Sequence, residues 1–349
     1  MAELWDPWNI SEGGFPRART SYEKLRFLLN YAVLAPSSHN SQPWLFRILD
    51  DAVELYADRT RVLPVVDPED RELIMSCGAA LLHLRIALRH IGFEGVVEIL
   101  PEPKKPDLLA RVSFGRQMEA SPEEHLLFQS IVKRRTNRMP FEARHVQETL
   151  LSELQTAVSK EGAWLHVIKE EDDRNKIADL VADADRIQMA DNRFRRELAS
   201  WIHPNRTASH DGMPAYAYVY AFGLSGLSSA FAPLVVRTFD IGKGRAAKDR
   251  QLASGSPVLA VLGTNGDTSK DWLSAGQALA RLLLRARAEN VWSSFLNQPI
   301  EVAELRLRVH DMLGRPGFPQ LILRMGYGPD VKPTPRRTPG EVLMRQALR

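Results

Sequence analysis

Two segments in opposite halves of the chain match each other. SCGAALLHL, which begins at Ser76, aligns with SAGQALARL, which begins at Ser274, so that a serine, a glycine, an alanine and two leucines coincide. Each segment has the periodicity of an apolar helix and leads to a strand-like run, RVSFG from Arg111 and RMGYG from Arg324. Because several elements recur in the same order, the sequence predicts two diverged copies of one folding unit.

The hydrophobic pattern predicts a mixture of helices and strands. Capping boxes at Thr20–Glu23 and Ser121–Glu124 predict two helix starts, and Pro36 must end the first of these helices. Further helices are expected over 78–92, 171–200 and 275–289, and strands over 44–49, 53–58, 109–115, 163–168, 256–263 and 319–326. This alternation favours an α+β fold. We expect the first copy to span residues 1–118 and the second to span residues 119–349.

Composition excludes several classes of function. The chain has 349 residues, 44% of them apolar, and its 46 basic and 43 acidic residues are interleaved, which argues against binding of nucleic acid. The N-terminus lacks the pattern of a signal peptide, and no apolar run is long enough for a membrane helix, so a cytoplasmic protein is expected. The single Cys77 precedes an apolar helix and is expected to be a buried small side chain.

The joint APSSHNSQPW, Ala35 to Trp44, carries far more polar chemistry than a turn requires. It offers the hydroxyl groups of Ser37 and Ser38 and the amide groups of Asn40 and Gln42. Asparagine and glutamine present a donor and an acceptor together, so such a loop can bind a flat heterocycle that has both carbonyl and ring N–H groups.

Two basic clusters suggest an anion. KRRTNR, from Lys133 to Arg138, follows a predicted helix, and Arg336 and Arg337 follow the last predicted strand. Guanidinium groups with a threonine hydroxyl suit a phosphate group, although each cluster alone is also typical of a solvated surface. Together with the polar joint, the clusters indicate a nucleotide-like ligand.

Other site chemistries find no support in the sequence. The nine histidines show no metal-binding spacing such as HExxH. GTNGDTSKDW, which follows a predicted strand, lacks the glycine spacing of a dinucleotide-binding turn. Ser209, His210 and Asp211 are adjacent in sequence, and adjacent residues rarely converge as a catalytic triad.

The order of four motifs resembles that of the nitroreductase family of FMN proteins. The motifs are APSSHNSQPWLF, RRTNR, AGQALARLLLRARAENVWSSFLNQPIE and LGRPGFPQLILRMGYGPDVKPTPRR. The two-copy layout, with ADRTRVLPVVDPEDRELIMSCGAALLHLRIALRHIGF in the first copy, resembles the Acg-type subfamily of mycobacteria and related bacteria. The resemblance implies a nitroreductase-like fold in which the two copies form an intramolecular pseudo-dimer.

The resemblance also implies FMN as the cofactor and a single site per chain. In ordinary nitroreductases one subunit supplies a phosphate motif and its partner supplies the Pro-Ser-Ser loop. Here the first copy keeps the loop and the second keeps the phosphate motif, so one site would be complete and the other lost, and no partner subunit would be required. The implied FMN-binding residues are Pro36, Ser37, Ser38, Asn40, Gln42, Arg134, Arg135, Thr136, Arg138, the backbone around Phe295, Leu296 and Asn297, and Arg336 or Arg337 beside Arg134 at the phosphate.

Three functions are compatible with these motifs. The first is an oxidoreductase that passes hydride or electrons through FMN to a small-molecule acceptor, with no catalytic acid or base marked by the motifs. The second is a protein that binds and sequesters FMN, and the third is a flavin-free structural relic.

The segment 195–226 bears on the choice between these functions. It contains the helix-breaking residues Pro204, Asn205, Gly212 and Pro214, which favour an irregular segment. By the resemblance, this segment corresponds to the helices that border the flavin face in nitroreductases, which implies an irregular cover over the flavin. The alternative is a loop that caps the core between the two copies. Trp201, Met213, Tyr216 and Tyr218 would give this cover apolar and aromatic bulk.

Overall fold

The computed structural model describes residues 6–205, 208–217 and 229–344, and it contains two four-stranded antiparallel sheets of the same topology. The first sheet has the order β1-β2-β4-β3 and the second β5-β8-β10-β9, so both follow the chain order first, second, fourth, third. The strands are β1 (Trp44–Ile48), β2 (Ala52–Ala57), β3 (Phe93–Ile99), β4 (Leu108–Gln117), β5 (Ala163–Val167), β8 (Val258–Thr264), β9 (Trp292–Phe295) and β10 (Phe318–Gly326). The predicted α+β fold with two copies of one unit is confirmed.

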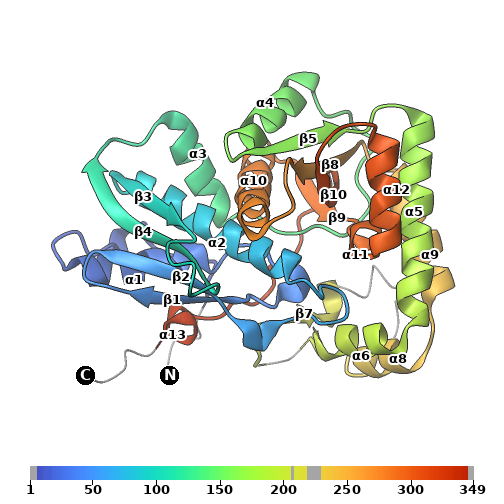
Figure 1. Cartoon of the computed structure of the whole chain (residues 1–349), viewed down its shortest axis with the longest axis horizontal. Helices are drawn as coiled ribbons and strands as arrows, with labels where there is room; N and C mark the ends of the chain where they lie inside the picture. Colours follow the sequence, from blue (N-terminus) through green and yellow to red (C-terminus); the bar gives the residue numbers. More distant parts are fainter. Residues whose placement is uncertain (1–5, 206–207, 218–228, 345–349) are drawn as a thin grey trace.

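The two sheets lie on either side of a central helix pair (Figure 1). α2 (Arg71–His90) and α10 (Ser269–Ala288) contain the matched segments of the sequence and pack against each other. Their closest approach is reciprocal, because a Cβ atom at Gly78 would lie 2.3 Å from the Leu273 carbonyl oxygen, and one at Gly276 would lie 1.9 Å from the Met75 carbonyl oxygen. Such reciprocal contacts are those of an interface with two-fold symmetry.

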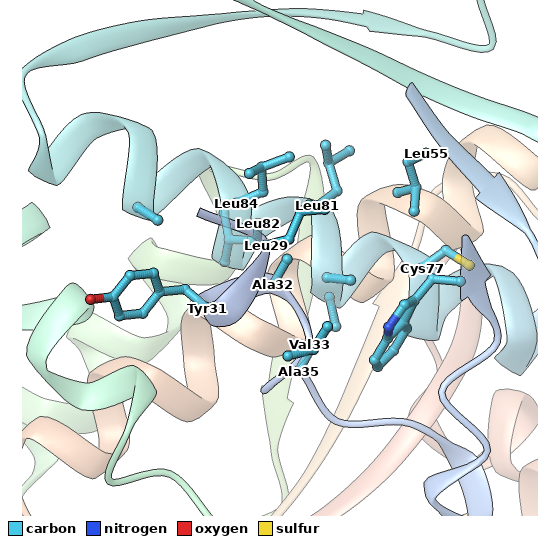
Figure 2. Packing of buried hydrophobic residues seen from close by; sticks show 14 of the residues in the cluster. Leu29, Tyr31, Ala32, Val33, Ala35, Leu55, Cys77, Leu81, Leu82 and Leu84 are labelled. Carbon is cyan, nitrogen blue, oxygen red and sulfur yellow. The ribbon is translucent and has the colours of Figure 1, made fainter. Parts of the chain in front are cut away.

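The core of the first unit forms between its sheet and the central pair. α1 (Ser21–Ala32) begins at the predicted capping box of Thr20 and buries Leu25, Leu28 and Leu29 against α2. Figure 2 shows Leu29 and Ala32 of α1 near Leu81 and Leu82 of α2. Cys77 is fully buried in this core, as expected, and its thiol donates to the Pro43 carbonyl oxygen at 3.1 Å.

The second unit repeats this plan with additional helices. α3 (Pro122–Ile131), which begins at the predicted capping box of Ser121, packs on both α2 and α10, and α4 (Glu148–Ser159) precedes β5 as α1 precedes β1. A short turn joins β1 to β2, whereas a long insertion separates β5 from β8. It contains α5 (Glu171–Ala190), α6 (Asn192–Ser200), β6 (Ile202–His203), β7 (Met213–Pro214), α8 (Ala232–Thr238) and α9 (Gly242–Ser254). The predicted boundary between residues 118 and 119 falls between β4 and α3 and stays a prediction.

The remaining elements complete the second unit and return the chain to the first. α11 (Gln298–Glu301) and α12 (Ala303–Leu313) link β9 to β10, and the tail after β10 crosses to the first sheet, where Leu343 bridges to Phe46 near α13 (Pro339–Val342). Single-turn helices occur at Glu12–Gly14, Ser38–Asn40 and Arg59–Arg61. Within the described ranges, no helix is both long enough and apolar enough to cross a membrane, and no group of histidine, cysteine and carboxylate side chains is arranged to hold a metal ion.

Some elements differ from the sequence-based predictions. α2 begins at Arg71 and α10 at Ser269, both earlier than predicted. In α10 the additional first turn starts at a capping box formed by Thr268 and Asp271. The sequence shows no clear hydrophobic periodicity for four elements, β3, β9, α8 and α9. β3 is half-exposed along its length, and α9 has little segregation of polar from apolar residues, so neither shows the periodicity on which prediction depends.

Candidate functional site

A cavity of about 530 Å³ lies between the two units and collects most of the predicted site residues. Its walls come from Trp8, the polar joint and the start of α2 in the first unit, and from several separate segments of the second. The predicted residues that line it are Pro36, Ser37, Ser38, Asn40, Arg134, Arg135, Thr136, Arg138, Phe295, Asn297 and Arg336. The volume is in the range of small-molecule and cofactor sites.

Three predicted residues lie behind the lining. The Gln42 side chain is fully buried, where its amide donates to the His210 carbonyl oxygen at 2.8 Å. Arg337 donates its backbone N–H to Gln42 Oε1 and its guanidinium to the Gln42 carbonyl oxygen, so it ties the tail to the joint. Leu296 packs in the apolar core of the second unit. Of the two tail arginines, Arg336 is the one that lines the cavity.

The joint has an unusual backbone that is held by its own side chains. His39, Asn40 and Gln42 have φ angles of 52°, 55° and 50°, a left-handed conformation that costs free energy in residues other than glycine and clusters at functional sites. The Ser37 hydroxyl accepts the Gln42 N–H at 3.0 Å, which closes the turn.

Asn40 connects the joint to two other segments. Its Nδ2 donates to the carbonyl oxygens of Gly212 at 2.8 Å and Pro335 at 3.1 Å, and its Oδ1 accepts from Arg336 at 2.8 Å. The amide of this residue therefore positions Arg336 in the cavity wall and anchors the chain around Gly212.

Buried arginines from two distant segments converge on the cavity. α3 ends at Ile131, which leaves residues 134–138 extended beside the joint, and Arg134 Nη2 donates to the Leu34 carbonyl oxygen at 3.2 Å. Arg134 and Arg336 are each 3% exposed, and the Nε atom of each is buried without a hydrogen-bond partner. Among the described residues, Arg134, Arg135 and Arg336 form no ion pair.

Trp8 lies between two of these cations. The Arg135 guanidinium lies 4.4 Å from the centre of the Trp8 ring and the Arg336 guanidinium lies 4.9 Å from it. Burial, together with the nearby charge of Arg135, lowers the pKa of Arg134 to about 9, and burial with the charges of Arg134 and Arg135 lowers the pKa of Arg336 well below its usual value. Because buried cations without counterions are costly, this wall is suited to an anionic group.

The segment after β9 lies next to this wall. Thr136 forms a bridge with Ser293 of β9, and the Asn137 N–H donates to the Ser293 carbonyl oxygen at 3.1 Å. The chain then turns at Asn297, whose Oδ1 accepts the Ile322 N–H at 3.1 Å. Pairing with β9 therefore places the arginines and the Phe295–Asn297 segment in one cavity.

Three carboxyl groups in the cavity wall, those of Glu72, Glu301 and Asp330, were not anticipated from the sequence. Glu72 is buried at the start of α2, accepts a hydrogen bond from the Ser38 hydroxyl, and lies 3.4 Å from Asn297 Nδ2. Burial, reinforced by the charge of Glu72, raises the pKa of Glu301 to about 8. Glu72 stands in the first turn of α2, where glutamate is common, so only its burial distinguishes it. Glu301, at the end of the short α11, carries no sequence signal of its own.

The chain after α6 covers part of the cavity. Met213, Tyr216 and Ala217 line it, together with Phe194 of α6. The Tyr216 hydroxyl donates to the Pro333 carbonyl oxygen at 2.6 Å, and the Gly212 N–H donates to the Asn40 carbonyl oxygen at 3.2 Å. Of the residues predicted to give this segment its bulk, Tyr218 lies outside the described residues.

Two histidines near the cavity have no part in a triad. His210 Nδ1 lies 2.9 Å from Glu341 Oε2, while the Ser209 hydroxyl bonds to Asp211, so the three adjacent residues do not form a relay. Burial, with the charges of Arg245 and Arg138, lowers the pKa of His39 to about 3, so its imidazole is neutral.

The fold and this cavity define an α+β protein with an arginine-lined cavity between two related units. Comparison with known proteins shows its family. No family model matches the chain. A protein of Mycobacterium tuberculosis with the name "Putative NAD(P)H nitroreductase Rv3131" is 32% identical over 336 residues, which cover 94% of this chain and 92% of that protein. The chain therefore belongs to the nitroreductase family.

Two further proteins are similar to this chain. "Putative NAD(P)H nitroreductase acg" of M. tuberculosis is 29% identical over 93% of this chain and 95% of its own length. A crystal structure of a nitroreductase with bound FMN from Bacteroides fragilis is similar with a TM-score of 0.37 and 12% identity, over 59% of this chain and 91% of that one.

Proposed function

We propose that this protein is an FMN-dependent oxidoreductase with one flavin site per chain. The observation that carries the proposal is the pair of buried arginines, Arg134 and Arg336, which come from different segments, have no ion-pair partner among the described residues, and have unpartnered Nε donors. A phosphate group would satisfy both donors, and the adjoining cavity of about 530 Å³ leaves room for a ring system.

The residues present fit FMN in two groups. Arg134, Arg135, Thr136 and Arg336 would hold the phosphate through charge-assisted hydrogen bonds, with Arg336 kept in place by Asn40. Ser37, Ser38 and the Phe295–Asn297 segment would contact the ring. FMN would supply hydride or electron transfer to a small-molecule acceptor, while the protein positions it and excludes water.

The visible absorption spectrum of the purified protein tests this proposal. The protein should be yellow, or should become yellow with a shifted flavin spectrum when excess FMN is added and the unbound cofactor is removed. A sample that stays colourless after this treatment contradicts both the oxidoreductase and FMN sequestration.

A second candidate, FMN sequestration without turnover, is favoured by the covering segment. Asn40 and Gln42 hold residues 210–212 over the joint, and Tyr216 is attached to the tail at Pro333. If this cover lies over the ring, a nicotinamide cannot stack on it unless the segment moves. We therefore propose a partly covered flavin and weak or absent reduction by NADH or NADPH.

Stopped-flow mixing of the FMN-loaded protein with NADPH distinguishes the two candidates. Slow or absent bleaching of the flavin, with rapid bleaching by dithionite, supports the covered site. Bleaching within seconds, followed by turnover of a nitroaromatic compound, rejects the cover and favours the ordinary enzyme.

A further inference from the structure

Glu72 and Glu301 both line the cavity although they come from different units. Glu72 begins α2 in the first unit, and Glu301 ends α11 in the second. Both line the cavity, and Glu72 accepts hydrogen bonds from Ser38 and Asn297, the side chains assigned above to the flavin ring. Glu72 therefore adjoins the part of the cavity where a ring and its substrate would react. Glu301 lies one helical turn after Asn297, whose carbonyl oxygen accepts the Glu301 N–H at 3.0 Å, and it lines the same cavity.

The groups around Glu301 favour its neutral form. From α2 it faces the negative Glu72 and the positive Arg71, from α5 it accepts a 2.6 Å hydrogen bond from Gln188, and from α9 it faces the positive Arg245. Arg71 is already bound to the Gln320 carbonyl oxygen at 2.7 Å, and Arg245 lies 2.8 Å from Asp185. Both cations have other partners, so their effect on Glu301 is smaller than the combined effect of burial and the charge of Glu72. The pKa of Glu301 therefore rises to about 8.

We propose that Glu301, with Glu72 beside it, is the proton donor that completes reduction of the substrate. The proposal rests on the proposed oxidoreductase function, since it concerns the same cavity. Two-electron reduction of a carbonyl-type acceptor such as a quinone requires one hydride and one proton. The acceptor gains the hydride with both electrons from the reduced cofactor, and its oxygen forms a new O–H bond as the O–H bond of Glu301 breaks.

The charge balance of the site explains why a neutral donor is needed here. Hydride transfer places a negative charge on the acceptor oxygen, near the carboxylate of Glu72. Proton transfer from Glu301 removes that charge from the acceptor and leaves a carboxylate, which takes up a proton from solvent before the next cycle. Positioned acids of this kind contribute about 10²- to 10⁴-fold to reaction rates.

Four variants test the proposal. Glu301→Gln keeps the volume of the side chain and an oxygen to accept the Gln188 hydrogen bond, but it has no acidic proton. Glu72→Gln removes the charge that helps Glu301 to keep its proton. Glu304→Gln, on the exposed face of α12 outside the cavity, is the matched control. Equal thermal unfolding midpoints establish that the variants are folded, and Glu301→Asp serves as the conservative substitution that keeps an acid.

The first measurement needs no cofactor. Infrared difference spectra of the flavin-free protein between pH 6 and 10 should show carboxylic-acid bands lost near pH 7, from Asp67 and Asp185, and a separate component that disappears near pH 8. That component should be missing in E301Q, shifted to lower pH in E72Q, and unchanged in E304Q. A spectrum of E301Q identical to that of the wild type overturns the assignment of the proton to Glu301.

The second measurement follows a single turnover. The FMN-loaded protein is reduced with dithionite, freed of excess reductant, and mixed with a water-soluble benzoquinone without oxygen. Reoxidation should slow about tenfold per pH unit above pH 8 in the wild type, be about 100-fold slower and independent of pH in E301Q, and recover partly in E301D. Full-speed reoxidation in E301Q overturns the donor role alone. Failure to bind FMN overturns the proposed function and this donor role with it, and the infrared band then reports only where the proton resides.

Discussion

Arg134 is a buried cation whose surroundings are incomplete. One of its terminal nitrogens donates to the Leu34 carbonyl oxygen, its Nε has no partner, and the neighbouring Arg135 repels it. Such an arrangement is costly for the protein alone and becomes favourable when a phosphate group occupies the wall. The position of this residue therefore allows the phosphate and ring contributions to be separated.

Replacing Arg134 with alanine should weaken FMN much more than riboflavin, which has no phosphate. The loss of a charge-assisted contact is expected to cost about 1.5–3 kcal/mol, or about 10- to 150-fold in Kd. Fluorescence titration of both flavins measures the difference, and Arg250→Ala on the surface of α9 provides the control. Equal losses for FMN and riboflavin would show that Arg134 does not contact the phosphate.

Buried acids give the protein a stability that depends on pH. Burial is the main cause that raises the pKa of Asp67 and Asp185 to about 7 and that of Glu301 to about 8. Over the range between the unfolded and folded pKa values, the folded state keeps protons that the unfolded state releases, so stability falls as pH rises. The pKa values of His39 and His83 are lowered to about 3, so these two residues make stability rise with pH, but only below pH 6.5.

The thermal unfolding midpoint of the flavin-free protein should therefore fall between pH 6.5 and 8. Differential scanning calorimetry in buffers of equal ionic strength measures it, and Glu301→Gln should reduce the slope above pH 7. A midpoint that rises over this interval would mean that the three acids are ionised in the folded state.

At the scale of elements, the crossing of α2 and α10 depends on two glycines. A Cβ atom at Gly276 would approach the Met75 carbonyl oxygen to 1.9 Å, and backbone atoms in the middle of a packed helix cannot move aside cheaply. Gly244 in α9 is the matched position, because a Cβ atom there would meet nothing within 4 Å.

Gly276→Ala should lower the free energy of unfolding by at least about 1–3 kcal/mol, since the helices must separate to admit the methyl group. Gly244→Ala should raise it by up to about 1 kcal/mol, because alanine favours an exposed helix. Urea unfolding followed by circular dichroism compares the two. If both variants are equally stable, the close contact of the central helices is not maintained in solution.

At the scale of the whole molecule, the two units share one cavity although their sheets are alike. The first unit contributes the polar joint, and the second contributes residues 134–138, the segment after β9 and the tail. The second unit has only a short turn between α4 and β5 where the first has its joint, so it offers no equivalent loop for a second site.

We therefore expect the protein to bind one FMN per chain. Titration of the flavin-free protein, followed by flavin fluorescence and by sedimentation to establish the oligomeric state, should saturate at a ratio of one and leave a monomer competent to bind. Saturation at two flavins per chain, or binding only by a dimer, would contradict a site completed within one chain.

The sequence by itself determined the features that depend on neighbouring residues. The capping boxes at Thr20 and Ser121 place helix starts because their hydrogen bonds close within four residues, and the match between the segments at Ser76 and Ser274 indicates the repeat because packing of the central pair constrains both copies alike. The polar joint and the arginine clusters could be predicted to share one ligand site from their residue types and their order along the chain, and the structure places most of them around one cavity.

Only the tertiary structure decided how these features meet. Arg336 lines the cavity and Arg337 binds the joint, a choice that no pattern reveals because adjacent residues in an extended tail point in different directions. Glu72 and Glu301 belong to different units and line one cavity only when the two sheets pack about α2 and α10. The raised pKa of Glu301 and the unpartnered Nε atoms of the arginines both result from burial. Burial is a property of the assembled fold rather than of any one segment.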